Sequence, residues 1–135
     1  MNKKSLLAIE RIISCINELI ILTKDKKAEY FYNSFEMNAL IDLLNQIELN
    51  INKINNKIKN KYNNIDWKII EKEKKYDDVF GESLSIGKTW DLSSNILKNT
   101  LLNDLIKLLE EEIPNYYKKL CNKNHKIFVK KTSNK

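Results

Sequence analysis

The chain has 135 residues and a formal net charge of +6, and its cationic side chains are all Lys except Arg11. This length suits one domain with a single core. Two Gly and one Pro are too few turn-forming residues for an all-β fold. Two Cys and one His also argue against a disulfide framework or a zinc site, so we expect no metal and no cofactor.

Most of the excess positive charge lies at the C-terminal end. Residues 122–135 contain five Lys and no acidic residue, while the rest of the chain is close to balanced. We therefore predict a helical domain over residues 1–121 and a basic tail over residues 122–135. Such a tail more often improves solubility or binds polyanions loosely than reads one specific site.

The sequence predicts neither a membrane segment nor a secretory signal. The apolar stretch over residues 12–22 is interrupted by Asn17 and Glu18, and no other run is long and apolar enough to cross a bilayer. These features favour a cytoplasmic location with no membrane partner.

Hydrophobic residues recur at helical spacing, which predicts an all-α fold. Ser5 is a suitable N-cap for a first helix that ends around residues 23–27. A second helix should start near Asn33 or Ser34, with Glu36 in its first turn. Its apolar positions alternate steps of four and three and form a narrow seam of Leu40, Leu44, Ile47, Ile51, Ile54 and Ile58.

The second half of the chain predicts two more helices. Asp66 is a suitable N-cap for a third helix, which should weaken before a loop at residues 81–88. A fourth helix should run over about residues 90–113, where Pro114 stops it or opens a short helix over residues 115–121. Together these segments predict an up-and-down four-helix bundle with a short extra C-terminal helix.

A family resemblance rests on the middle of the chain. Residues 61–70 read KYNNIDWKII, and a second Trp follows at Trp90. This stretch resembles the HepT-like proteins, ribonuclease toxins of the HEPN superfamily, which typically read Lys-Tyr-Pro-x-Ile-Pro-Trp-x-x-Ile and place a Trp at the start of the last long helix. The resemblance covers most of the chain up to about Ile113. It implies a HEPN-like helical bundle that forms a homodimer.

The residues that carry chemistry in that family are replaced here. Aligned on Trp67, the family's Arg and Asn fall on Lys74 and Lys75, its His on Val79 and its Tyr on Gly81. In the family, the Arg and His of two subunits cut RNA without a metal, and a partner nucleotidyltransferase modifies that Tyr. Because Val79 can exchange no proton, the resemblance implies a ribonuclease site that has decayed.

The leading hypothesis is therefore a diverged HepT-like toxin–antitoxin component. It would bind RNA, either tRNA or mRNA, or dock to a nucleotidyltransferase antitoxin. The candidate RNA contacts are Lys74, with Lys75 beside it, and Lys72; each would meet a phosphate as a point charge. The alternative is a helical interaction module that pairs its seam with another helix and has no nucleic-acid role.

Two further patterns bear on chemistry. Residues 81–89 (GESLSIGKT) resemble a phosphate-binding P-loop, but one residue too many separates the glycines, and no parallel sheet is expected around them. We expect a loop between helices instead. A site that has migrated to Tyr76, Asp77 or Asp78 is a third possibility for the chain.

An aromatic cluster precedes the second helix, beside Lys26 and Lys27. Its rings could stack bases, but clusters of this kind more often close the end of a helical bundle, and we expect them in the core. We expect Trp67 and Trp90 to be core anchors as well. The cluster consists of Tyr30, Phe31, Tyr32 and Phe35.

Overall fold

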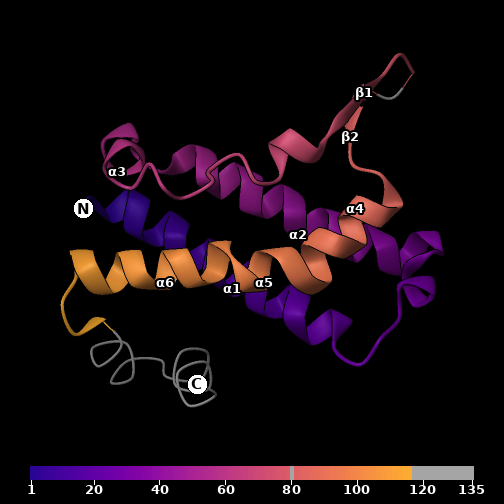
Figure 1. Cartoon of the computed structure of the whole chain (residues 1–135), viewed down its shortest axis with the longest axis horizontal. Coiled ribbons are helices and arrows are strands. Elements are labelled where there is room, and N and C mark those ends of the chain that lie inside the picture. The colour runs from indigo at the N-terminus through magenta and orange to yellow at the C-terminus, as the bar shows by residue number, and fades with distance from the viewer. Residues whose placement is uncertain (80, 117–135) are drawn as a thin grey trace.

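Two long antiparallel helices organise the fold, α1 (Lys3–Thr23) and α2 (Ser34–Lys53), joined through the 3₁₀ turn η1 (Ala28–Phe31) (Figure 1). The computed structural model describes residues 1–79 and 81–116. One contact shows how the two helices are aligned. Ser5 Oγ, near the start of α1, accepts a hydrogen bond of 2.9 Å from the backbone N–H of Asn55, just beyond α2.

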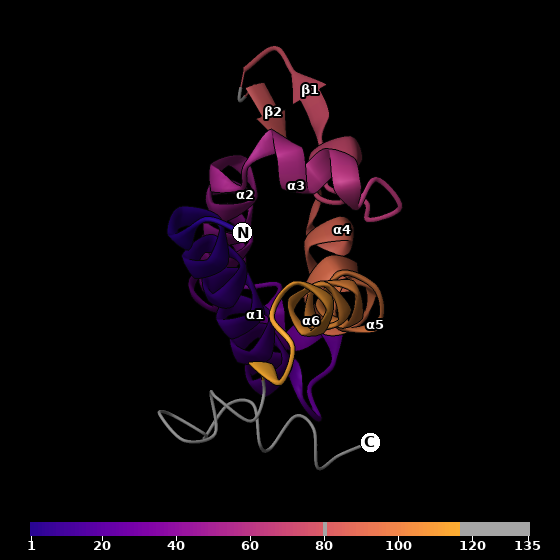
Figure 2. The same ribbon diagram turned by 90° about the vertical axis from the view of Figure 1, so that its left-hand side faces the viewer.

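The rest of the described chain adds short elements and one long helical run. Figure 2 shows α1 and α6 beside each other and a hairpin projecting away from the helices. This part of the chain is thus mostly helical, with one two-stranded sheet. In chain order the elements are α3 (Asn56–Lys61), η2 (Glu71–Glu73), β1 (Lys75–Asp77), β2 (Gly81–Ser83), α4 (Ile86–Asp91), the π-helical η3 (Leu92–Ile96), α5 (Leu97–Asn99) and α6 (Leu101–Glu112).

The predicted seam forms the centre of the core. All six of its residues are buried, and none has an exposed fraction above 7%. They belong to one hydrophobic cluster with the inner faces of α1 and α6, so removal of apolar surface from water stabilises the fold. Because the chain's own core covers the seam, this face is not available to a helix of another protein. The seam from Leu40 to Ile58 is therefore not a free surface for the interaction module that the alternative hypothesis describes.

The first two helices begin at side-chain caps. Of the two residues predicted to start α2, Asn33 is the N-cap, since its side chain accepts hydrogen bonds from the backbone N–H groups of Phe35 and Glu36. The prediction that Ser5 caps α1 is wrong. Asn2 is the N-cap and accepts from the Ser5 N–H at 2.7 Å, which leaves the buried Ser5 hydroxyl to hold Asn55.

The seam does not lie on one continuous helix. At Ile54 the backbone becomes extended, and α2 ends at Lys53. Asn55 then caps α3, because its side chain accepts a 2.6 Å hydrogen bond from the backbone N–H of Lys57. Asn competes for local backbone hydrogen bonds in this way, so it interrupts a helix that the apolar period alone would continue.

The predicted third helix is wrong. Asp66 does accept from the backbone N–H of Lys68, as a cap would, but residues 67–70 form turns and only η2 follows. The chain then enters an antiparallel hairpin in which Asp77 pairs with Gly81. Asp77 accepts from the Val79 N–H at 2.7 Å, and Gly81 has a φ of +75°, which L-residues with a side chain rarely adopt. The all-α prediction is corrected by this hairpin.

The predicted fourth helix begins earlier than expected and is interrupted. Ser85 caps α4, so helical structure starts at Ile86 inside the segment expected to be a loop. The π-helical η3 follows, and the backbone breaks again at Thr100 before α6. Hydroxyl groups at Ser94 and Thr100 bond to carbonyls four residues earlier, an arrangement that bends helices. The predicted end is right, since α6 stops just before Pro114.

The aromatic cluster divides between core and surface. Phe31 is buried and its ring centroid lies 5.2 Å from that of Trp90. The core prediction therefore holds for Phe31 and is wrong for the other three rings, which are exposed. Trp67 and Trp90 are partly buried against the core. The exposed rings are Tyr30, Tyr32 and Phe35.

Some predictions lie outside the described residues. The short helix predicted over residues 115–121, the domain boundary after it and the basic tail over residues 122–135 all extend beyond residue 116. Within the described part of the chain, none of the helices has the length and apolar character needed to cross a bilayer.

Replacing Ser5 by Ala tests the contact that aligns α1 with the end of α2. The variant would leave the Asn55 N–H without its acceptor, so we expect the free energy of unfolding to fall by about 1–2 kcal/mol. Urea denaturation followed by circular dichroism measures this change. The matched control is Ser83→Ala on the exposed hairpin, which should leave stability unchanged. Equal effects of the two substitutions would contradict this account.

Candidate nucleic-acid interface

The three lysines predicted to contact RNA occupy different environments. Lys74 Nζ lies 2.5 Å from Glu48 Oε1 of α2, and each side chain is 22% exposed. Lys72 is paired with Asp66. Lys75 lies on β1, is exposed, and takes part in none of the ion pairs found among the described residues. Two of the three charges are thus already balanced by carboxylates within the chain.

The positions of the family's His and Tyr lie on the projecting hairpin. Val79 is in its turn and is 80% exposed, while Gly81 begins β2. Tyr76 and Asp78 are exposed on the same hairpin, and Asp77 holds the turn. The segment that resembled a P-loop runs from an antiparallel strand into α4, which is not the strand–loop–helix arrangement that binds nucleotide phosphates.

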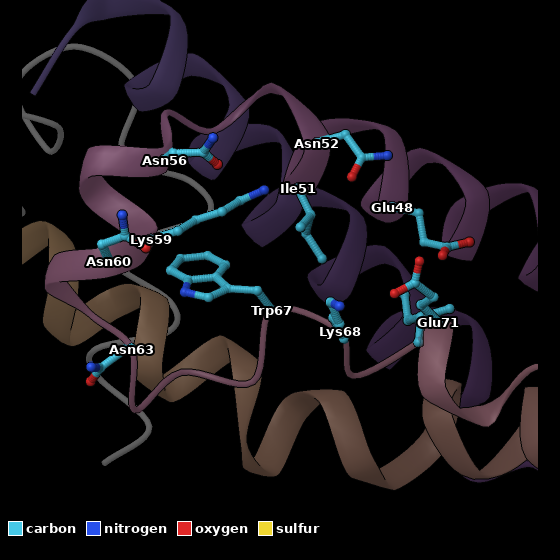
Figure 3. A pocket seen from close by; sticks show the side chains of 11 residues that line it. Glu48, Ile51, Asn52, Asn56, Lys59, Asn60, Asn63, Trp67, Lys68 and Glu71 are labelled. Carbon is cyan, nitrogen blue, oxygen red and sulfur yellow. The ribbon is translucent and has the colours of Figure 1, made fainter.

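A groove of about 450 Å³ lies on a different face, between the end of α2, α3 and the segment over residues 63–71 (Figure 3). Ile51 and Ile70 are its buried apolar residues, while most of its other side chains are polar. Trp67 is its only aromatic lining residue. The lining consists of Glu48, Ile51, Asn52, Asn56, Lys59, Asn60, Asn63, Trp67, Lys68, Ile70 and Glu71.

A hydrogen bond and packing against the core fix the position of the Trp67 indole. Its Nε1–H donates a hydrogen bond of 3.2 Å to the backbone carbonyl of Tyr62, and the ring packs against the core. Tyr62 is itself buried, and its hydroxyl donates to Glu112 Oε2 of α6 at 2.6 Å. The ring is therefore anchored to both α3 and α6, and what it offers to the groove is its aromatic surface.

Lys61, Tyr62 and Glu112 form a hydrogen-bonded network next to Trp67 that includes an ion pair. Lys61 Nζ lies 2.7 Å from Glu112 Oε2, and the hydrogen bonds from Lys61 and Tyr62 lower the pKa of the Glu112 carboxyl. Burial, followed by the hydrogen bond to Glu112, raises the pKa of the Tyr62 phenol. At neutral pH the phenol is therefore a neutral donor and the carboxylate a charged acceptor, which strengthens this hydrogen bond.

Both acidic and basic side chains line the groove. Figure 3 shows Glu48 and Glu71 together at one end, and Lys59 extending across the groove beside Trp67. Burial lowers the pKa of Lys59 from the usual value for Lys. The sequence around α3 is also basic, since residues 49–65 include Lys53, Lys57, Lys59 and Lys61 and no acidic residue.

Four amides complete the lining. Asn56 and Asn60 lie one turn apart on α3, Asn52 comes from α2 and Asn63 from the turn that follows α3. No hydrogen bond of these four side chains occurs within the part of the chain that the structure describes. Each amide can both donate and accept, so together they present a neutral hydrogen-bonding surface.

Sequence reasoning did not identify this groove. The sequence patterns assign no role to the Asn and Lys residues of residues 49–65, and they predict that Trp67 is a core anchor. One signal is present: a run of seventeen residues with four Lys and no acidic residue ends at Ile65, with Asp66 between it and Trp67. What the sequence did not show is the break at Asn55, which brings α3 over Trp67.

In comparisons with known proteins, no family profile, no curated protein and no solved structure matches this chain.

The contacts of Glu112 with Tyr62 and Lys61 predict that the free energy of unfolding depends on pH. Because the folded-state pKa of Glu112 is lowered, its contribution is present above the unfolded value of about 4.3 and is lost as the pH falls through the folded value. Glu112→Gln should reduce the free energy of unfolding by about 1–2 kcal/mol near neutral pH, mainly through Tyr62, because Lys61 is exposed to solvent. The difference from the wild type should shrink towards about pH 3.

Urea denaturation at the two pH values measures both effects. The control is Glu110→Gln, an exposed carboxylate two residues away on the same helix, which should behave as the wild type does. If the Glu112→Gln deficit were the same at both pH values, the charged form of this carboxyl would not be the source of the stabilisation.

Proposed function

We propose that this chain is an RNA-binding protein, and that the surface formed by α3 and the groove beside Trp67 is its RNA-contacting face. The observation that carries the proposal is the amide-lined groove with an anchored aromatic ring, which Lys59 and Lys68 line and which draws most of its other residues from or beside the acid-free stretch over residues 49–65. Lysines supply phosphate contacts, and aromatic side chains stack on unpaired bases, so the combination is typical of surfaces that bind single strands.

The distribution of charge supports a local interface. Over residues 1–116 the sequence has seventeen Lys and Arg against eighteen Asp and Glu, a net charge of −1. Lys61 is paired with Glu112, but Lys53, Lys57 and Lys59 take part in none of the ion pairs of the described residues, so they form a local positive region against this slightly acidic background. Residues 117–135 contribute seven more Lys and no acid, which would add attraction to any polyanion that the folded part binds.

The proposal is for binding and not for cleavage. Ribonuclease chemistry needs a group that exchanges protons near neutral pH beside the reacting ribose. Val79 and Gly81 stand at the positions where the resemblance places the family's His and Tyr. We therefore propose a diverged, non-cleaving member of the HepT-like group. Its bundle topology, homodimer and docking to a nucleotidyltransferase antitoxin stay predictions.

Two lysines on α3 provide the test. Neither Lys57 nor Lys59 pairs with a carboxylate in the described part of the chain. The double variant Lys57→Ala/Lys59→Ala should bind a short single-stranded RNA about tenfold more weakly, because removing one Lys–phosphate pair costs about 1 kcal/mol before screening by salt. The slope of log affinity against log salt should fall by about 1.4, at about 0.7 for each phosphate that is no longer neutralised.

Fluorescence anisotropy of a labelled RNA across a salt series measures both quantities. Lys24→Ala is the control, since it removes an exposed Lys just after α1, at the end of that helix opposite Ser5 and its contact with Asn55, and should change neither. Lys74→Ala compares the family position with the groove; because Lys74 is paired with Glu48, we expect a smaller decrease in affinity than on α3. A larger decrease for Lys74→Ala, with no effect on α3, would move the interface to the hairpin.

A further inference from the structure

The groove has features that the lysines alone do not explain. A surface that only followed a phosphate backbone would need cations and little else. Here four amides and one aromatic ring line a concave site, together with Lys59 and Lys68. Amides that donate and accept suit a neutral ligand with a mixed hydrogen-bonding edge, and a flat ring suits a flat partner. An unpaired nucleobase has both properties.

The state of Trp67 points to stacking. Its only polar hydrogen is already used, since Nε1–H donates to the Tyr62 carbonyl at 3.2 Å. The ring therefore cannot act as a hydrogen-bond donor to a ligand without breaking that contact. It is also anchored in advance through Tyr62 and Glu112, so little conformational freedom would be lost on binding. What remains for a ligand is contact with the aromatic surface.

The charges orient the ligand. Glu48 and Glu71 lie together at the end of the groove away from α3 (Figure 3). Lys74 balances Glu48, so Glu71 is the carboxylate that would repel a phosphate there. Lys59 of α3 lines the groove beside Trp67, and Lys57 lies on the same short helix outside the groove. A nucleotide would therefore place its phosphates towards α3 and its base inside the groove. The volume of about 450 Å³ is within the range of small-molecule sites and suits one nucleotide better than a duplex.

We infer that this groove seats one unpaired nucleobase of the bound RNA, stacked on Trp67 and held along its edge by Asn56 and Asn60. This inference rests on the proposed RNA binding and specifies it. It requires that the chain prefer single strands, because the bases of a duplex are stacked and paired and cannot enter the groove.

The RNA itself provides the first test, so that folding of a variant is not at issue. Two labelled decamers are compared by anisotropy on the wild-type protein: one with bases throughout, and one of equal charge in which every residue is abasic. The decamer with bases should bind about 5- to 100-fold more tightly, the range expected for stacking of one base. Binding of a duplex of the same sequence should depend on salt but should not change in the variant Trp67→Leu, because its bases are paired and stacked.

Variants then locate the preference in the groove. Trp67→Leu should reduce the ratio of the two affinities to about one while keeping the salt dependence, and Trp67→Phe should retain most of it, because Phe also stacks. Asn56→Ala/Asn60→Ala should lower the ratio without touching the ring. Asn38→Ala, an exposed Asn on α2 outside the groove, should leave it unchanged. Thermal unfolding of each variant confirms that it is folded.

The outcomes separate the two claims. Equal, salt-dependent binding of both decamers would overturn the base site and leave RNA binding through the lysines standing. A preference for bases that survives both Trp67→Leu and Asn56→Ala/Asn60→Ala would also overturn the site. Absence of salt-dependent binding to either decamer would overturn the proposed function and this inference together.

Discussion

The break between α2 and α3 is the constraint on which the candidate site depends. The buried seam has to continue into Ile54 and Ile58, yet the backbone leaves the helix at Ile54 and starts a new one after Asn55. Ser5 Oγ holds the Asn55 N–H, and the Asn55 side chain caps α3, so both polar groups of the break are satisfied. A continuous helix would carry Lys59 and Asn60 away from Trp67, and no groove would form.

The second element of the site is a relay of contacts that ends at Trp67. Glu112 of α6 accepts the hydroxyl of Tyr62, and the carbonyl of Tyr62 accepts the indole N–H. A partly buried indole needs a partner for its only donor, and here an internal carbonyl supplies it. The same arrangement leaves the ring without a polar group for ligands. The hydrogen bond from the indole to the Tyr62 carbonyl thus has two effects: it fixes the position of the ring, and it leaves the ring no free hydrogen-bond donor.

The sequence predicted the core better than the site, for reasons visible in particular residues. The steps of three and four along α2 report burial directly, and every seam residue is buried. The segment after Asp66 was predicted wrongly, because its charged run carries no period and its hairpin depends on Asp77 and on the positive φ of Gly81. The groove joins residues from three segments, and only the turn at Asn55 brings them together.

Glu48 connects the two regions that matter for function. Its carboxylate pairs with Lys74, the residue just before the hairpin, and the same side chain lines the acidic end of the groove. The charge at the family's Arg position is therefore balanced by a residue of the groove. Lys74 therefore helps to fix the segment that follows Trp67, and its charge is less available to a polyanion than those of Lys57 and Lys59, which take part in no ion pair of the described residues. Lys88, paired with Glu73 at 3.1 Å, ties the same segment to α4. Both pairs hold the end of this segment nearest the hairpin, and the hydrogen bond from Tyr62 to Glu112 holds its start. Fixing both ends restrains the position of Trp67, as a stacking site requires.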